Sequence, residues 1–233
     1  MAAVPKPAAT VILVRDGARG LEVWLMERNR SVGFMASAWV FPGGRVDPED
    51  AERPAVGGDF SRVPRGFWVA AARELEEEAR LRLGGDAYDL DRLRHWAHWI
   101  TPEAEPRRYD THFFLALLRP GEEPEIDGGE AVDGRWFRPA EAVEQSFAGR
   151  LLLAPPTVRC LQELSAWPDC RSLQQADRRI LPICPRFLLE GEEVYVLLPG
   201  DPDFPAEEGV EAPTRFPIRG WSNEALKALV RPG

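Results

Sequence analysis

The segment that most constrains this chain is an acidic run that reads Arg73-Glu74-Leu75-Glu76-Glu77-Glu78-Ala79-Arg80-Leu81. On a helix, which turns by about 100° per residue, Glu74, Glu77 and Glu78 fall on one narrow arc beside an apolar stripe that contains Leu75. Like charges this close destabilise an isolated helix, so the cluster favours a divalent cation that neutralises them. Carboxylate ligands of this kind suit Mg²⁺ or Mn²⁺.

An alternative interpretation is a solvated acidic face, in which the arginines of the run pair with glutamates one helical turn away. The sequence before the run favours the metal site. An apolar segment, Trp39-Val40-Phe41, leads into Pro42-Gly43-Gly44, and glycines in such a turn let the backbone approach a ligand closely. Carboxylates together with a glycine turn therefore predict a site for phosphate and metal.

These residues resemble the signature of the Nudix hydrolases, which runs from a glycine through a glutamate to the pattern Arg-Glu-apolar-x-Glu-Glu-x-Gly-apolar. Gly44 opens the match, and the second half is carried by Arg73, Glu74, Leu75, Glu77, Glu78 and Leu81. Asp50 stands where the first glutamate is expected, and Arg80 stands where the last glycine is expected. Residues 51–72 occupy the place of about seven family residues, which makes an insertion of about 15.

The insertion is rich in turn-forming residues, so we expect a loop followed by a helix that begins near Gly66. An interrupted signature resembles the branch of the family that contains the peroxisomal coenzyme A diphosphatases. The flanking segments that carry this likeness are Trp39–Asp47, Trp99–Glu103 and Pro106–Phe114. The resemblance covers roughly residues 8–165.

Hydrophobic patterning predicts a mixed sheet flanked by helices. The expected strands are Ala8–Arg15, Leu21–Glu27, Trp39–Phe41, Leu93–Ile100, Thr111–Leu118 and Arg135–Phe137, with a helix from Pro139. The family resemblance implies that this α/β chain forms a Nudix-type α/β/α sandwich. We expect residues 1–150 to be the Nudix domain. Residues 151–233 would form a small C-terminal extension, a helix after Pro155 and a β-hairpin between Phe187 and Leu198, packed on the same domain.

Composition narrows the class of protein. A chain of 233 residues with 44% hydrophobic content can bury one full core and an appendage. The net charge of -9 argues against a general affinity for nucleic acid. Cys160, Cys170 and Cys184 have spacings that fit neither a zinc site nor a disulfide framework, so reduced structural thiols are expected.

No segment reaches the roughly 20 apolar residues that a membrane-spanning helix needs. The sequence shows neither a secretory signal nor a Ser-Lys-Leu peroxisomal address. We therefore expect a cytoplasmic protein with no membrane partner.

By resemblance, the catalytic residues are Arg73, Glu74, Glu77 and Glu78. The metal would be held by Glu74, Glu77 and Glu78, and Glu78 is its principal ligand. Gly43 and Gly44 would contribute a backbone carbonyl or room for metal and phosphate. Arg73 would orient Glu77 through a charge-assisted hydrogen bond at spacing i, i+4, although an ordinary surface pair is the alternative. Whether Asp50 reaches the metal is open.

Several further side chains are candidates outside the signature. Arg28, Arg30, Arg107 and Arg108 are expected to bind substrate phosphate, because a guanidinium matches phosphate oxygens; solvated arginines are the alternative. His95 and His98 lie three residues apart, so on a regular strand they would face opposite sides and take packing or hydrogen-bonding roles. The general base is left open among Glu103, Glu105, Glu125, Asp127 and Glu130.

Three functions remain in competition. The first is a metal-dependent hydrolase that cleaves the diphosphate bond of a nucleoside diphosphate linked to another moiety, with coenzyme A or acyl-coenzyme A favoured by the branch resemblance. The second is a hydrolase of ADP-ribose or another dinucleotide. The third is a non-catalytic sensor that uses the Nudix fold to bind a nucleotide. In each case the partner is a nucleotide-containing small molecule, and a homodimer is left open.

Overall fold

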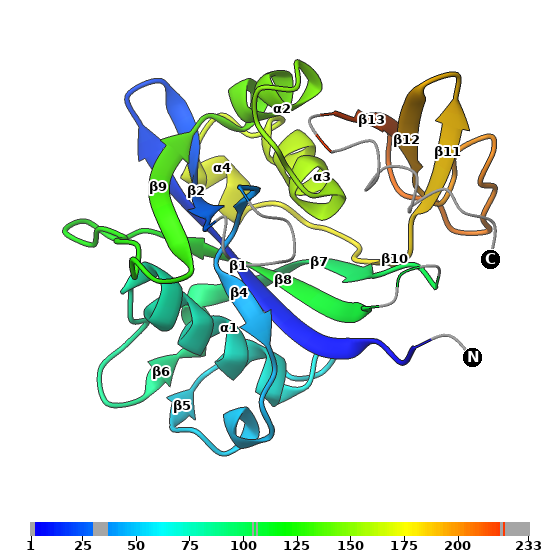
Figure 1. Ribbon diagram of the computed structural model, residues 1–233. Helices are drawn as coiled ribbons and strands as arrows, with labels where there is room; N and C mark the ends of the chain where they lie inside the picture. Colours follow the sequence, from blue (N-terminus) through cyan, green and yellow to red (C-terminus); the bar gives the residue numbers. More distant parts are fainter. Residues whose placement is uncertain (1–2, 30–36, 104, 106, 220, 222–233) are drawn as a thin grey trace.

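The structure is a computed structural model that describes residues 3–29, 37–103, 105, 107–219 and 221 (Figure 1). Its centre is a mixed sheet of eight strands. The strands are β1 (Lys6–Gly17), β2 (Gly20–Arg28), β3 (Trp39–Val40), β4 (Gly43–Arg45), β7 (Leu93–Ile100), β8 (Tyr109–Leu117), β9 (Ala131–Phe137) and β10 (Pro182–Ile183). They follow the order β10-β7-β8-β1-β2-β3, while β4 also pairs with β1 and β9 with β2.

Strand β1 lies at the middle of this sheet and is buried on both faces. It runs parallel to β8 and antiparallel to β2 and β4. Val11 and Leu13 pack into the core on one face, and Ile12 and Val14 pack into the core on the other. This explains why its sequence is a continuous apolar run, because a strand covered on both faces has no polar side to alternate with.

Helices cover the two faces of the sheet and complete the sandwich (Figure 1). Helix α1 (Arg65–Ala79) lies on one face, where Trp68 and Leu75 are buried. Helices α2 (Pro139–Phe147), α3 (Pro155–Leu164) and α4 (Cys170–Gln174) lie on the other, with Leu161 and Leu173 in the second core. The α/β fold with a mixed sheet is thereby confirmed.

A second sheet follows the helices and contains β11 (Arg186–Glu190), β12 (Glu193–Leu197) and β13 (Arg215–Ile218). Strands β11 and β12 are the expected antiparallel hairpin. Val196 and Phe216 of this sheet belong to the same core cluster as Ile12 of β1. The domain boundary at residue 150 remains a prediction. Among the residues placed here, no helix has the length and apolar character needed to cross a membrane.

The segment 52–64, which is part of the expected insertion, contains little regular structure. It follows the 3-10 helix η1 (Pro48–Ala51) and includes the two-residue strand β5 (Ala55–Val56), which pairs in parallel with β6 (Tyr88–Asp89). A second 3-10 helix, η2 (Leu90–Arg92), follows β6. Helix α1 begins at Arg65, next to the expected start near Gly66.

Arg80 closes α1 in a left-handed conformation, with φ 51° and ψ 23°, and its backbone N–H donates to the Leu75 carbonyl. This backbone region favours glycine, because a Cβ crowds the neighbouring carbonyl there. The signature glycine expected at this position therefore has a structural reason, and Arg80 takes the same conformation in its place.

The expected placement of His95 and His98 on opposite sides of the strand is wrong. The register of β7 against β8 shifts between His95 and Ala97, which is a β-bulge. Trp96 and Ala97 consequently both enter the core on the α2 and α3 side. His95 and His98 both lie against His112 of β8. The extra residue in the bulge thus returns both histidines to one face.

Candidate functional site

The candidate site lies where the acidic face of α1 meets the glycine turn of β4. The backbone N–H of Gly43 donates a 2.7 Å hydrogen bond to Glu78 Oε2. A side-chain Cβ at Gly44 would collide with the carboxylate of Glu74. Glycine at position 44 therefore leaves room for the Glu74 carboxylate to lie against the turn. Pairing of Gly44 with Ala9 holds the turn on the central strand.

The two carboxylates that face the glycines are desolvated. Burial raises the pKa of Glu78 to about 8, against the opposing hydrogen bond from Gly43, and the negative charges of Glu74 and Glu130 act in the same direction as burial. Burial also raises the pKa of Glu74, although Arg73 opposes the shift. Two buried carboxyl groups that repel one another bind a divalent cation favourably, because the cation replaces lost hydration and cancels the repulsion.

Arg73 organises the acidic helix from a buried position. Its Nη1 donates to Glu74 Oε1 at 2.8 Å and to Glu77 Oε2 at 2.9 Å. Its Nε and Nη2 donate to the two carboxylate oxygens of Asp50 at 2.9 and 3.0 Å, and Nη2 also donates to the Arg45 carbonyl at 2.9 Å. The bond to Asp50 is the main reason why the pKa of Arg73 lies above its ordinary value. The guanidinium therefore connects η1, β4 and α1.

Asp50 is the residue in this network whose role the sequence left open. Its side chain is fully buried, pairs with Arg73 and accepts a 2.8 Å hydrogen bond from the backbone N–H of Asp47. The carboxylate thus anchors Arg73 rather than pointing to the glycine turn. The sequence feature that points to Asp50 is its place in the signature, where the family has a glutamate.

Glu77 is placed differently from Glu74 and Glu78. Its carboxylate is 56% exposed and rests on Arg73, whereas Glu74 and Glu78 face the glycine turn. Among the residues that the structure describes, the carboxylate oxygens of Glu74, Glu77 and Glu78 do not all lie within 4.8 Å of one another. The assignment of all three as metal ligands stays a prediction.

Arg28 lies beside Glu78. A cavity of about 10 Å³ is lined by Arg28, Glu78, Asp127 and Glu130, together with apolar side chains. The Nε of Arg28 is buried there without a hydrogen-bond partner among the residues placed in the structure. A buried donor of this kind is costly unless a ligand accepts from it. Of the five acidic loop residues considered as general base, Asp127 and Glu130 are the two that line this cavity.

The other predicted phosphate-binding arginines lie elsewhere. Arg107 is exposed in the turn between β7 and β8. Arg108 donates to the backbone carbonyls of Thr101 at 2.9 Å and of Ala3 at 2.8 Å. No contact joins either arginine to the acidic face of α1 within the described ranges. Arg30 and Pro106 lie outside those ranges.

Comparisons with known proteins agree with this architecture. The family model of the NUDIX domain matches residues 4–155. Putative nudix hydrolase 7 of Caenorhabditis elegans is 29% identical over 244 residues, which cover 90% of this chain and 78% of that protein. The acyl-coenzyme A diphosphatase NUDT19 of Homo sapiens is 34% identical over 126 residues, 48% of this chain but only 32% of the relative. The crystal structure of a NUDIX hydrolase from Alicyclobacillus acidocaldarius superposes with a TM-score of 0.66 at 28% identity, covering 75% of this chain and 97% of that one.

We predict that Asp50→Asn lowers the free energy of unfolding by about 3 kcal/mol, because it removes the fully buried anionic partner of Arg73 and leaves the guanidinium only the more exposed Glu74 and Glu77. The matched control is Glu77→Gln, which removes an exposed partner of the same arginine and should cost less than about 1 kcal/mol. Urea denaturation of both variants measures the difference. Equal losses would contradict the anchoring role of Asp50.

A second prediction concerns pH. Because the folded pKa of Glu78 is raised to about 8, the metal-free protein should lose stability as pH rises from the ordinary glutamate pKa of 4.5 through 8. Glu78→Gln cannot ionise, so without divalent ions it should be more stable than the wild type at pH 9 and similar to it at pH 5. Urea denaturation at both pH values tests this. A difference that does not change with pH would show that Glu78 is not desolvated as described.

Proposed function

The chain belongs to the NUDIX domain family, and on this premise we propose that it is a metal-dependent hydrolase that cleaves the diphosphate bond of coenzyme A species. The observation that carries the proposal is the meeting of Glu74 and Glu78 with the Gly43–Gly44 turn beside the unpartnered Nε of Arg28. Desolvated carboxylates suit a hard cation, and a buried guanidinium suits a phosphate oxygen. The two features together match a metal-bound diphosphate.

Glu74 and Glu78 would hold Mg²⁺ or Mn²⁺, and Glu77 would complete the ligand set from the exposed side. Support for this fit comes from the raised pKa values of Glu74 and Glu78, since a carboxyl that is costly to ionise alone gains most from a bound cation. When bound, such a cation makes water more acidic and stabilises the charge that develops on phosphate oxygens. Gly43 and Gly44 leave room for it.

The chain's own residues would perform the remaining work. Arg73 fixes Glu74 and Glu77 in orientation through its two Nη1 hydrogen bonds. Arg28 would bind an oxygen of the diphosphate. Glu130, which lines the cavity with Glu78, would accept the proton of the attacking water. Water then bonds to one phosphorus, the bridging P–O bond breaks, and the two phosphate monoesters leave.

The choice of coenzyme A rests on two observations. The interrupted signature resembles the coenzyme A diphosphatase branch, and a relative of that name matches this chain over 48% of its length. Cleavage of the diphosphate would give 3′,5′-ADP and a 4′-phosphopantetheine product. Arg107, which is exposed, would be free to meet the additional 3′-phosphate. We further propose that residues 1–150 carry this chemistry.

We predict that Glu78→Gln lowers kcat by about a hundredfold or more, because the amide keeps the volume of the side chain but loses the anionic oxygen. Glu76→Gln is the matched control on the same helix, since Glu76 pairs with Arg82 and Tyr88 away from the glycine turn, and it should retain turnover. Phosphomonoester release is measured with Mg²⁺, with Mn²⁺ and after removal of divalent ions. Unchanged turnover in Glu78→Gln or without divalent ions would rule out this mechanism.

A further prediction separates the substrates. Coenzyme A should exceed dephospho-coenzyme A in kcat/KM by roughly ten- to a hundredfold, which corresponds to about 1.5–3 kcal/mol for a charged contact to the 3′-phosphate. Arg107→Gln should reduce this preference while leaving the rate with dephospho-coenzyme A unchanged. A preference for ADP-ribose would overturn the coenzyme A assignment and retain the hydrolase. Nucleotide binding without any turnover would instead favour a sensor.

A further inference from the structure

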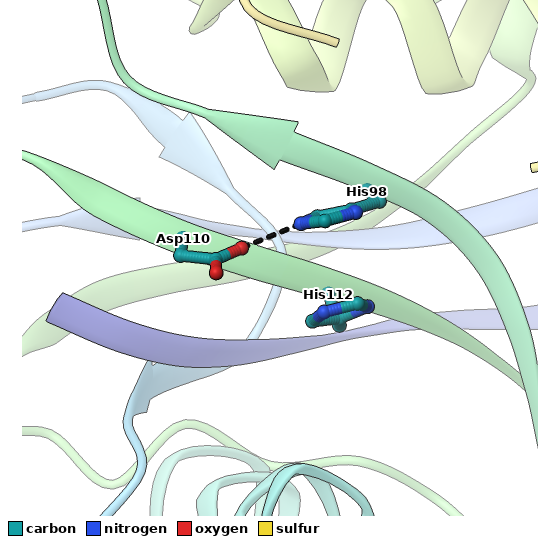
Figure 2. A group of neighbouring side chains, drawn as sticks. All are labelled: His98, Asp110 and His112. Carbon is teal, nitrogen blue, oxygen red and sulfur yellow. Dashed lines mark hydrogen bonds and ion pairs between the residues drawn. The ribbon is translucent and has the colours of Figure 1, made fainter. Parts of the chain in front are cut away.

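All three histidines of this chain lie in one cluster on the sheet. His95 and His98 come from β7 and His112 from β8. The β-bulge places His95 and His98 on the side of the sheet where His112 contacts Phe67 of α1. Asp110, two residues before His112, joins them (Figure 2). The cluster is built from four residues that the proposed diphosphate chemistry does not use.

The side chains of His98, Asp110 and His112 offer ligand atoms that all lie within 4.8 Å of one another. His98 Nε2 lies 2.5 Å from Asp110 Oδ1, as Figure 2 shows. The rings of His98 and His112 are stacked, with centroids 4.0 Å apart and an interplanar angle of 16°. Small rotations of these rings would direct two imidazole nitrogens and one carboxylate oxygen to a common point.

His112 is held in a way that suits a ligand. Its Nδ1 lies 2.9 Å from His95 Nε2, and the edge contact with Phe67 of α1 fixes the ring further, with centroids 4.7 Å apart. The other ring nitrogen, Nε2, keeps its lone pair when Nδ1 donates to His95. Histidines that bind metals commonly donate their second nitrogen to a neighbouring acceptor in this manner.

The cluster spans the boundary between the core and solvent, since His112 is buried. The cluster also reaches water, since the side chain of Asp110 is 37% exposed and that of His98 19% exposed.

We propose that His98, Asp110 and His112 bind one divalent transition metal ion of the zinc class. Two imidazoles and a carboxylate are a ligand set that such ions accept, and the exposed side leaves a coordination position for water or a small ligand. Mg²⁺ prefers oxygen ligands, so the two metal sites would differ in the ion they select.

The site is separate from the acidic face of α1. His98, His112, Ala9 and Gly44 are successive partners in one row across the sheet. Two strand spacings separate His112 from Gly44, or about 10 Å between Cα atoms. Phe67 near the start of α1 touches His112, whereas Glu74 and Glu78 further along the same helix approach β4.

The test is a Zn²⁺ titration followed by long-range ¹H–¹⁵N NMR of the imidazole rings, in excess Mg²⁺ so that the carboxylates are occupied. Because the chain has only three histidines, every ring nitrogen can be assigned. We expect one equivalent of Zn²⁺ to shift a ring nitrogen of His98 and Nε2 of His112, while Nδ1 of His112 keeps its proton. Acidification should release the ion, because protons compete for the ligands.

Variants decide which atoms bind. His98→Gln and Asp110→Asn, both at partly exposed positions, should each weaken Zn²⁺ binding about tenfold or more, with folding checked by circular dichroism. Glu144→Gln, an exposed carboxylate on α2 across the sheet, is the matched control and should bind as the wild type does. Glu78→Gln should also keep the response, so failure of the proposed hydrolase and failure of this site are distinguishable.

Two outcomes would overturn the proposal. Histidine resonances that respond to pH but not to Zn²⁺ would show that His98 and Asp110 form an ion pair only. Variants of His98 and Asp110 that bind Zn²⁺ as tightly as the wild type would place the ion elsewhere.

Discussion

The buried ion pair between Arg73 and Asp50 is the interaction on which the arrangement of the acidic site depends. Arg73 is 5% exposed and Asp50 is fully buried, so neither charge has water as an alternative partner. Removing one partner of such a pair leaves an uncompensated charge, which is far costlier than losing a surface pair. The pair joins η1 to the middle of α1. The segment between them, residues 52–64, therefore begins at a point that is fixed to the helix, so its length does not displace the glutamates.

The central strand β1 provides the second constraint. It is bonded to β8 on one side and to β2 and β4 on the other, and it is buried on both faces. Gly44 and His112 are both registered against Ala9, so the glycine turn and the histidine cluster keep a fixed separation. One sheet row thus lies beside two groups of potential ligands with different chemistry. The carboxylates of α1 meet the row at Gly44 of β4, and the histidine cluster with Asp110 lies on β7 and β8.

Much of the fold can be predicted from the sequence because it depends on local patterns of residues. The strands β1 and β2, the hairpin of β11 and β12, and the start of α1 follow from apolar runs, turn residues and helical periodicity. The acidic arc of α1 and the glycine turn were predicted as one site for the same reason. The prediction that His95 and His98 face opposite sides of the strand is wrong. It assumes that successive side chains alternate between the two sides, and the bulge interrupts this alternation with one extra residue. No local pattern around His112 and Asp110 indicates that β7 brings two more histidines alongside them.

The sequence by itself determined the family, the mixed α/β architecture and the spacing of Glu74, Glu77 and Glu78 on one helix, since these depend on residue order and on the fixed geometry of the helix. Only the tertiary structure decided which carboxylates are desolvated, that Asp50 anchors Arg73, that Arg28 and Glu130 lie beside Glu78, and that three histidines meet. Burial, ion pairing and strand register are properties of segments distant in sequence. They arise when the chain packs against itself, so no local pattern encodes them.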